Sequence, residues 1–221
     1  MRESVIEGKS RLWEGVATGA GGTTRDALGD DIVKQEKALR NSIGTNGSLM
    51  RCSPMGLWFG PWIDDSKFIN SSVSNMSSVT HTHPHSIHAS LMYTKILCRI
   101  LANMSWQELS PENPLEVRII SRLNDSFDYP YDPGAWPMRG TAEFSLYAGL
   151  YSFVKTNSFA EGIEFAVSIG GDTDTYAAIA GGLLGAYYCY AAILEEWKEA
   201  ILGHNKMVTL ATDLYQLRIN Q

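Results

Sequence analysis

The sequence GGDTDT, residues 170–175, combines residue types and spacing that suggest chemistry. Asp172, Asp174 and Thr175 offer oxygen ligands of the kind that Mg²⁺ and Mn²⁺ prefer. The small and apolar residues over 176–188 predict a buried helix, and carboxylates beside a packed interior need a counter-charge. The alternative is structural, with Asp172 capping that helix and the acids complementing its dipole. We expect Asp172 and Thr175, three residues apart, to face the same way.

The D-T-D-T part of this sequence, residues 172–175, has a second chemical interpretation. D-x-D also begins the phosphatase nucleophile motif D-x-D-x-[TV]. Tyr176 stands at the fifth position here and no clear strand precedes the motif, which disfavours this interpretation. The glycine pair before Asp172 is predicted to end the preceding helix, because glycine tolerates the left-handed conformation.

Four of the five histidines lie within HTHPHSIH at 81–88. An H-x-H pair can bind zinc at the end of a barrel strand, but the chain is shorter than the roughly 250 residues of such a barrel. A polar helix N-terminus is the structural alternative. We favour a third interpretation, in which three side chains lie beside a ligand's phosphates or a substrate pocket near helix N–H groups: Thr80, His81 and His83. The other two are predicted to lie at the surface: His85 and His88.

One arginine stands inside an apolar segment, in NGSLMR at 46–51, after a turn signal and a hydroxyl. Arg51 can pair with a buried carboxylate or contact the anionic part of a ligand, since its guanidinium fits both. Of these two roles we favour the structural one.

The composition narrows the class of protein. A net charge of -6 and a pI of about 5.4 argue against a nucleic-acid-binding surface, which would be basic. No stretch reaches the roughly 18 apolar residues of a membrane span, and Glu3 and Glu7 stand where a signal peptide needs an apolar run. The cysteines Cys52, Cys98 and Cys189 are far apart in apolar surroundings, as expected of core residues in a reducing compartment. We therefore expect a cytoplasmic protein without nucleic-acid or membrane partners.

Apolar residues at helical spacing, with almost no alternation of period two, predict an all-α chain. We expect one domain over residues 1–221. A loop rich in proline and aromatic residues is predicted at 122–139, and loops of that length are usually functional or disordered. The expected helices cover 2–16, 31–42, 65–77, 140–155, 159–169, 172–190 and 193–218.

Local signals predict where further helices begin or stop. Thr23 or Thr24 offers an N-cap for a short helix. Pro54 is expected to interrupt an apolar run, and Pro84 to lie in the first turn of a long helix, where its missing N–H has no partner to lose.

Four segments in order resemble successive blocks of the ADP-ribosylglycohydrolase family, which includes the dinitrogenase reductase-activating glycohydrolases. The segments are GGTTRDAL at 21–28, TNGSLMRCSPMGLW at 45–58, VTHTHPHSIHAS at 79–90 and GGDTDTYAAIAGGLLGAYY at 170–188. Each block alone is modest, but the four in this order are specific. The resemblance covers the chain from about residue 10 to its end.

The resemblance implies an orthogonally packed all-α bundle with one or two Mg²⁺ or Mn²⁺ ions. It implies hydrolysis of the glycosidic bond between ADP-ribose and a protein side chain or a related acceptor. It makes Asp172, Asp174 and Thr175 metal ligands. The matched residues near the ligand-binding cleft are Asn46, Gly47, Ser48, Arg51, Thr80, His81 and His83. An aromatic set in the predicted loop could stack on the adenine or ribose: Tyr129, Tyr131 and Trp136.

The chain also departs from the family pattern. The sequence has no opening G-D-A-x-G helix and no T-D-D-T segment, which supply the other half of the metal site and an acidic residue near the scissile bond. We therefore assign no catalytic residue and expect an N-terminally truncated homologue with activity weakened or lost. A non-catalytic ADP-ribose-binding or structural protein is the alternative. Two residues replace a common glycine and proline: Cys189 and Ile193.

A further hypothesis keeps full catalysis. A partner chain would complete the metal site, or substitute acids would do so: Asp30, Asp31, Asp64 and Asp65. Apolar faces left by the missing helices would be exposed, or covered by a partner chain or a second copy of this one.

Overall fold

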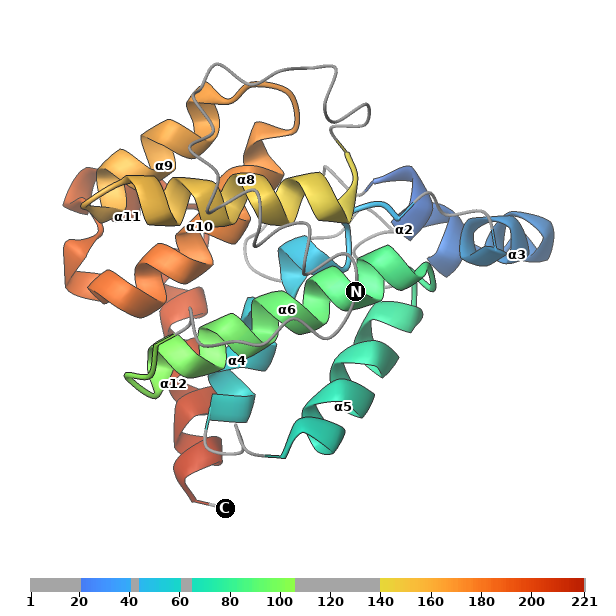
Figure 1. Cartoon of the computed structure of the whole chain (residues 1–221), viewed down its shortest axis with the longest axis horizontal. Helices are drawn as coiled ribbons and strands as arrows, with labels where there is room; N and C mark the ends of the chain where they lie inside the picture. Colours follow the sequence, from blue (N-terminus) through green and yellow to red (C-terminus); the bar gives the residue numbers. More distant parts are fainter. Residues whose placement is uncertain (1–20, 41–43, 61–64, 106–139, 221) are drawn as a thin grey trace.

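The structure is a computed structural model that describes residues 21–40, 44–60, 65–105 and 140–220 (Figure 1). Over these ranges the chain forms helices and no strand, apart from one isolated antiparallel bridge between Thr45 and Thr141. The all-α prediction is confirmed. None of the helices in these ranges is long and apolar enough to cross a lipid bilayer.

Most of the expected helices are present, with ends that differ by a few residues. The N-terminal part contains α2 Gly22–Leu28, α3 Ile32–Arg40, η1 Leu49–Arg51, α4 Ser53–Phe59, α5 Ser66–Ser78 and α6 Pro84–Leu101. The C-terminal part contains α8 Ala142–Lys155, α9 Phe159–Ser168, α10 Thr173–Tyr188, η4 Tyr190–Ala192, α11 Glu195–Ala200 and α12 His204–Ile219. The helix expected at 2–16 and the loop expected at 122–139 lie outside the described residues.

Helices α8 and α10 form the centre of the main core. Every residue of α8 from Ala142 to Phe153 is buried, which is typical of a helix covered on all sides. The two helices approach closely because Gly149 has no side chain: a Cβ there would lie 2.4 Å from Ile179 Cγ2. The buried helix predicted after the GGDTDT segment is therefore present, and the core holds its N-terminal end in place.

Helix α6 connects this core to a second cluster. The Tyr93 hydroxyl of α6 donates to the carbonyl of Ile179 in α10 at 3.1 Å. Figure 1 shows α6 running between α8 and α5, and it packs against both. The second cluster joins α6 to α4 and α5 through Phe59, Ile69, Val73, Leu91 and Cys98. Two sequence segments of the resemblance, 45–58 and 79–90, are thereby fixed against the core.

The predicted cap of α2 is wrong. The helix begins at Gly22 with Gly21 as its N-cap residue, and no side chain caps it. Thr23 and Thr24 lie inside the helix. The Thr23 hydroxyl instead accepts a hydrogen bond from Thr45 Oγ1 at 3.3 Å, so a tertiary contact replaces the local cap.

Two proline predictions and one helix end have different outcomes. Pro84 lies in the first turn of α6, as predicted. Pro54 does not interrupt its segment but lies in the first turn of α4, where proline is tolerated. The single helix predicted at 193–218 is two helices, because Gly203 adopts a left-handed φ of 75° between α11 and α12.

Cys189 is exposed, in contrast to the prediction, whereas Cys52 and Cys98 are buried as expected. Cys189 follows the last residue of α10 with φ 68° and ψ 165°, a region that glycine adopts almost alone. The chain leaves the core at this turn, which places the residue at the surface. Burial raises the pKa of each of the two buried thiols to about 12.

Candidate functional site

Asp172 and Thr175 face each other at the N-terminal end of α10, as predicted. The Thr175 hydroxyl donates to Asp172 Oδ1 at 3.2 Å. Asp174 is exposed, and its Oδ1 accepts from the Thr175 backbone N–H at 2.9 Å. Gly170 and Gly171, with φ of 74° and 86°, turn the chain into this helix.

The alternative in which Asp172 caps α10 is confirmed for its position but not for its side chain. Asp172 occupies the N-cap position, but its side chain accepts no capping hydrogen bond from the helix backbone. Its oxygens accept from side chains instead, Oδ1 from Thr175 and Oδ2 from Asn46 Nδ2 at 2.5 Å. The carboxylate is therefore oriented by tertiary contacts.

The loop 44–51 lies against this end of α10. Its start pairs with the N-terminal end of α8 through the bridge between Thr45 and Thr141. Near its end, Met50 Sδ lies 3.8 Å from Thr175 Oγ1. The segments that contain Asn46 and Asp172 are thus brought into direct contact.

Arg51 is held by neutral acceptors. Its Nη1 donates to the Gly47 carbonyl at 2.9 Å and its Nη2 to Thr80 Oγ1 at 2.7 Å. The expected alternative of a buried carboxylate partner is not found within the described ranges. Burial lowers the pKa of Arg51, which still stays protonated because arginine titrates so far above neutrality. Arg51 thus joins the loop to the segment before α6.

The same contacts surround His81. Thr80 Oγ1 accepts from Arg51 and lies 2.7 Å from His81 Nδ1. A threonine oxygen has two lone pairs and one proton, so Thr80 can donate to Nδ1 or accept from it while it accepts from Arg51. Burial, and next the charge of Arg51, lower the pKa of His81 to about 4. At neutral pH this ring is therefore uncharged.

Gly47 and Thr24 lie beside the His81 ring. A Cβ at Gly47 would stand 2.9 Å from His81 Nε2 and 3.2 Å from Thr24 Oγ1. Only glycine lets the loop pack this closely against the ring. The segment 21–28, which contributes Thr24, therefore also reaches the loop.

Ser48 lies in the interior and is fully buried. Its Oγ accepts from Ser77 Oγ at 2.9 Å and lies 3.4 Å from Ser90 Oγ. Ser77 and Ser90 belong to α5 and α6, so the contacts of Ser48 in this structure fasten the loop to two helices.

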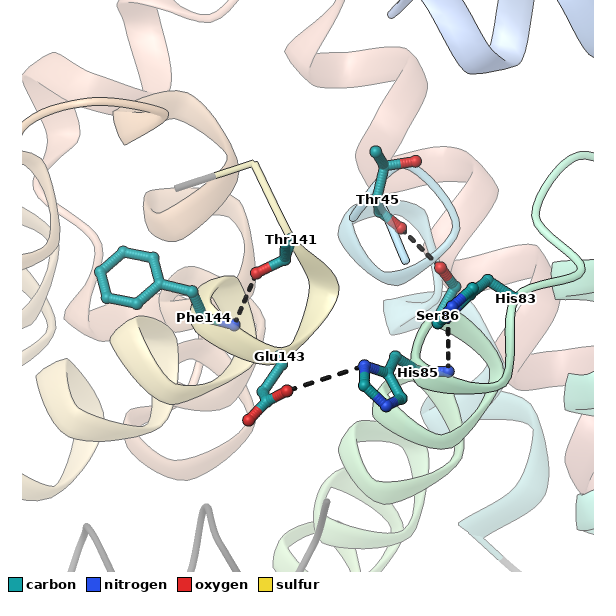
Figure 2. Close-up of polar contacts among 7 residues, drawn as sticks. All are labelled: Thr45, His83, His85, Ser86, Thr141, Glu143 and Phe144. Carbon is teal, nitrogen blue, oxygen red and sulfur yellow. Dashed lines mark hydrogen bonds and ion pairs between the residues drawn. The ribbon is translucent and has the colours of Figure 1, made fainter. Parts of the chain in front are cut away.

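Figure 2 shows how the first turns of α6 and α8 meet beside the loop. His83 caps α6, with its Nδ1 accepting from the His85 N–H at 3.2 Å, and burial followed by the charge of His85 lowers the pKa of His83. His85 Nδ1 lies 3.7 Å from Glu143 Oε2. Ser86 Oγ donates to the Thr45 carbonyl at 2.8 Å. The side chain of His85 is 46% exposed, so it is at the surface as predicted, although its ring also faces Glu143.

Sequence reasoning missed the part that α8 plays. Asn46 Nδ2 donates to Ser145 Oγ at 2.7 Å, and Glu143 faces the first turn of α6. A serine in a mostly apolar helix was the available signal, but nothing in the pattern connects it to residue 46. The structure thus gathers parts of five segments: 21–28, 44–51, 80–86, 141–145 and 172–175.

Several proposed residues are either outside the described ranges or serve as helix caps. The aromatic set Tyr129, Tyr131 and Trp136 lies outside the described residues, as does Asp64. Asp31 and Asp65 serve as helix caps, since Asp31 Oδ1 accepts from the Lys34 N–H at 3.1 Å and Asp65 Oδ1 from the Phe68 N–H at 2.9 Å.

The donor set of α10 fits a hard cation in part. Asp172, Asp174 and Thr175 offer only oxygen, as Mg²⁺ and Mn²⁺ require. Across the part of the chain that the structure describes, no group of three or more His, Cys, Asp or Glu side chains gathers closely enough to hold an ion. These three residues alone offer fewer oxygen donors than an octahedral shell needs.

Comparison with known protein families identifies the family of this all-α chain. The sequence model of the family described as ADP-ribosylglycohydrolase matches residues 6–221. The chain belongs to the ADP-ribosylglycohydrolase family, and the resemblance seen in the four segments is confirmed.

Curated relatives carry names of the same kind. "Putative ADP-ribosyl glycohydrolase L543" of Acanthamoeba polyphaga mimivirus is 26% identical over 220 residues, which cover 89% of this chain and 65% of the viral protein. "ADP-ribosylarginine hydrolase Tri1" of Serratia proteamaculans (strain 568) is 26% identical over 204 residues, which cover 89% of this chain and 54% of that protein. "ADP-ribosylhydrolase ARH3" of Bos taurus is 36% identical over 61 residues, 28% of this chain and 17% of the bovine protein. The chain spans less than two thirds of the length of each.

A solved structure supports the fold. A chain of an "ADP-ribosylglycohydrolase-related protein complex" superposes with a TM-score of 0.68 at 24% identity, covering 90% of this chain and 69% of that one. At this identity the likeness shows the fold alone.

Proposed function

We propose that this protein hydrolyses the glycosidic bond between ADP-ribose and a protein side chain or a related acceptor, with Mg²⁺ or Mn²⁺ as cofactor. Family membership and the names of relatives support the substrate class. The observation that carries the proposal is the meeting of loop 44–51 with the N-terminal end of α10, where Asp172 accepts from both Asn46 and Thr175.

The carboxylate side of the site, which consists of Asp172, Asp174 and Thr175, would hold the ion. Asp172, Asp174 and Thr175 supply three oxygen donors, and water or ligand hydroxyls would complete the shell. A bound divalent ion supplies Lewis-acid stabilisation of charge at the reacting bond. Asp172 is already oriented for this task by its two side-chain donors.

The arginine side of the site, which consists of Arg51 and its neighbours Gly47, Thr80 and His81, would bind the ligand's anionic oxygens. Arg51, which is partly exposed, would supply the positive charge that attracts them. The His81 ring is uncharged, 1% exposed and close to Gly47. His81 therefore supports this side from the interior and is not assigned a contact with the ligand.

The test is release of ADP-ribose from a mono-ADP-ribosylated arginine peptide, measured chromatographically with the purified chain. We expect release that requires Mg²⁺ or Mn²⁺, is abolished by EDTA and is lost in Asp172→Ala. Glu196→Ala, an exposed acid on α11, is the matched control and keeps the wild-type rate. Release that EDTA leaves intact, or full activity in Asp172→Ala, contradicts the proposal.

A second candidate is ADP-ribose binding without hydrolysis. It is favoured by the incomplete donor set of the described residues and by the lack of a T-D-D-T segment in the sequence. On the same grounds we expect turnover by this chain alone to be weak. Titration calorimetry with ADP-ribose, with and without Mg²⁺, separates the two: binding without release supports the second candidate, and no binding contradicts both.

A further inference from the structure

The side chain of Asn46 connects three elements of the site. Its Nδ2 donates to Asp172 Oδ2 of the α10 N-terminus at 2.5 Å and to Ser145 Oγ of α8 at 2.7 Å. An ionised carboxylate only accepts hydrogen bonds, so the amide atom facing Asp172 is the nitrogen. Asn46 is 9% exposed, and both of its side-chain N–H groups are used inside the protein.

The backbone of Asn46 is held as firmly as its side chain. Its N–H donates to the Gly140 carbonyl at 3.3 Å, and its carbonyl accepts from the Met50 N–H at 3.0 Å. The neighbouring residue Thr45 pairs with Thr141. The amide donor is therefore presented by a turn that is fixed on both sides, which limits the orientations open to it.

The contact leaves the carboxylate of Asp172 able to bind a cation. Thr175 donates to Oδ1 and Asn46 to Oδ2, and each carboxylate oxygen has a second lone pair. Hydrogen bonds to an ionised group are about twice as strong as neutral ones. Residues that orient a metal-binding side chain in this way change metal affinity by about 10–100-fold when they are mutated.

We propose that Asn46 is a positioning residue, which holds Asp172 in the orientation that binds a divalent cation, rather than a residue that contacts the ligand. The consequence for metal affinity rests on the proposed function. The hydrogen bond itself does not, and the two parts are tested separately.

The first experiment measures Mn²⁺ binding by titration calorimetry in wild type, Asn46→Asp and Ser145→Ala. Asn46→Asp keeps the shape but removes both N–H donors, and we expect about 10–100-fold weaker binding. Ser145→Ala removes only the hydrogen bond between Asn46 and α8, and we expect a smaller decrease in Mn²⁺ affinity. Asn75→Asp, at an exposed position on α5, makes the same charge change and is the control. Affinity of Asn46→Asp within twofold of wild type overturns the proposal.

The second experiment needs no metal. In ¹⁵N-labelled wild-type protein with EDTA, we expect the Asn46 side-chain NH₂ protons to exchange slowly with solvent, and to exchange rapidly in Asp172→Ala. Fast exchange in wild type overturns the proposal without a variant having to fold. If wild type binds no Mn²⁺, the proposed cofactor fails, and slow exchange that depends on Asp172 still supports the positioning contact.

Discussion

The two sides of the candidate site differ in how their charges are satisfied. Arg51 is a partly buried cation whose N–H groups donate to neutral oxygens of Gly47 and Thr80. Asp172 and Asp174 are carboxylates at a helix end that is partly open to solvent. Among the described residues the arginine side thus has its hydrogen-bond partners, whereas no lysine or arginine there is paired with these carboxylates, and a bound cation would supply their counter-charge. We infer that the first mainly determines stability and the second mainly determines metal binding.

The largest expected effect is on the carboxylate side. Asp172→Ala should weaken Mn²⁺ binding by more than about 100-fold, because it removes an anionic ligand and leaves the other donors too few to dehydrate the ion. The free energy of unfolding without metal should also fall, by about 1–3 kcal/mol, because the buried Asn46 amide and Thr175 hydroxyl lose an ionised acceptor. Calorimetric titration and urea unfolding measure the two quantities. A large loss of stability with intact Mn²⁺ affinity would reverse the comparison.

Arg51→Met should show the opposite pattern. The side chain is similar in length but cannot donate, so the Gly47 carbonyl and Thr80 lose charged hydrogen bonds worth about 2–3 kcal/mol in the free energy of unfolding. Mn²⁺ affinity should stay close to wild type, since Arg51 has no contact with the α10 carboxylates. Lys34→Met, at an exposed position on α3, serves as the control for loss of a positive charge. Unchanged urea unfolding of Arg51→Met would show that the arginine side does not determine stability.

The pH dependence of stability should come from the arginine side. His81 has a folded-state pKa of about 4 against an ordinary value of 6.5, so the unfolded chain binds the proton first as the pH falls. Stability is therefore nearly full above about pH 6.5 and declines toward pH 4, by about 3 kcal/mol from this residue. His81→Gln should flatten this decline in urea unfolding measured at several pH values. His83, whose pKa is lowered as well, contributes in the same direction. An equally steep decline in His81→Gln would assign the effect to other groups.

The smallest effect is expected at the far end of α10, which tests whether the comparison is specific to the site. Cys189 adopts φ 68° and ψ 165°, and glycine avoids the strain of such a conformation, which costs about 1–3 kcal/mol for other residues. Glycine also gains freedom in the unfolded chain, so Cys189→Gly should raise the free energy of unfolding by only about 0.5–1 kcal/mol. Thermal unfolding measures the change, and Cys189→Ala, which keeps the strain, is the control. Altered Mn²⁺ affinity in Cys189→Gly would contradict the separation of the two ends.

Local sequence patterns predicted much of the fold. Apolar spacing gave α5, α6, α8, α9 and α10 nearly within their observed ends, and Pro84 marked the start of α6. Patterns failed where a tertiary contact or a backbone turn outweighed the local signal. Thr23 contacts Thr45 and does not cap α2, and Gly203 divides the C-terminal helix although the residues on both sides suit one continuous helix.

The candidate site was predictable in part. The spacing of Asp172 and Thr175 placed them on one face of a helix, because residues three apart are neighbours there. The partner of Arg51 was not predictable, since a neutral carbonyl and a hydroxyl leave no charge pattern in a sequence. The contribution of Ser145 was missed for the same reason.

The sequence by itself determined the family, the all-α class and the residues that can do chemistry, because helical periodicity and motif spacing are local properties of a chain. Only the tertiary structure decided which of these residues meet. Asn46 and Asp172 are 126 positions apart, and their hydrogen bond exists because α8 and α10 pack closely enough at Gly149 to bring the bridge at Thr45 over the end of α10. Such a contact depends on the shape of the whole core, which no short stretch of sequence encodes.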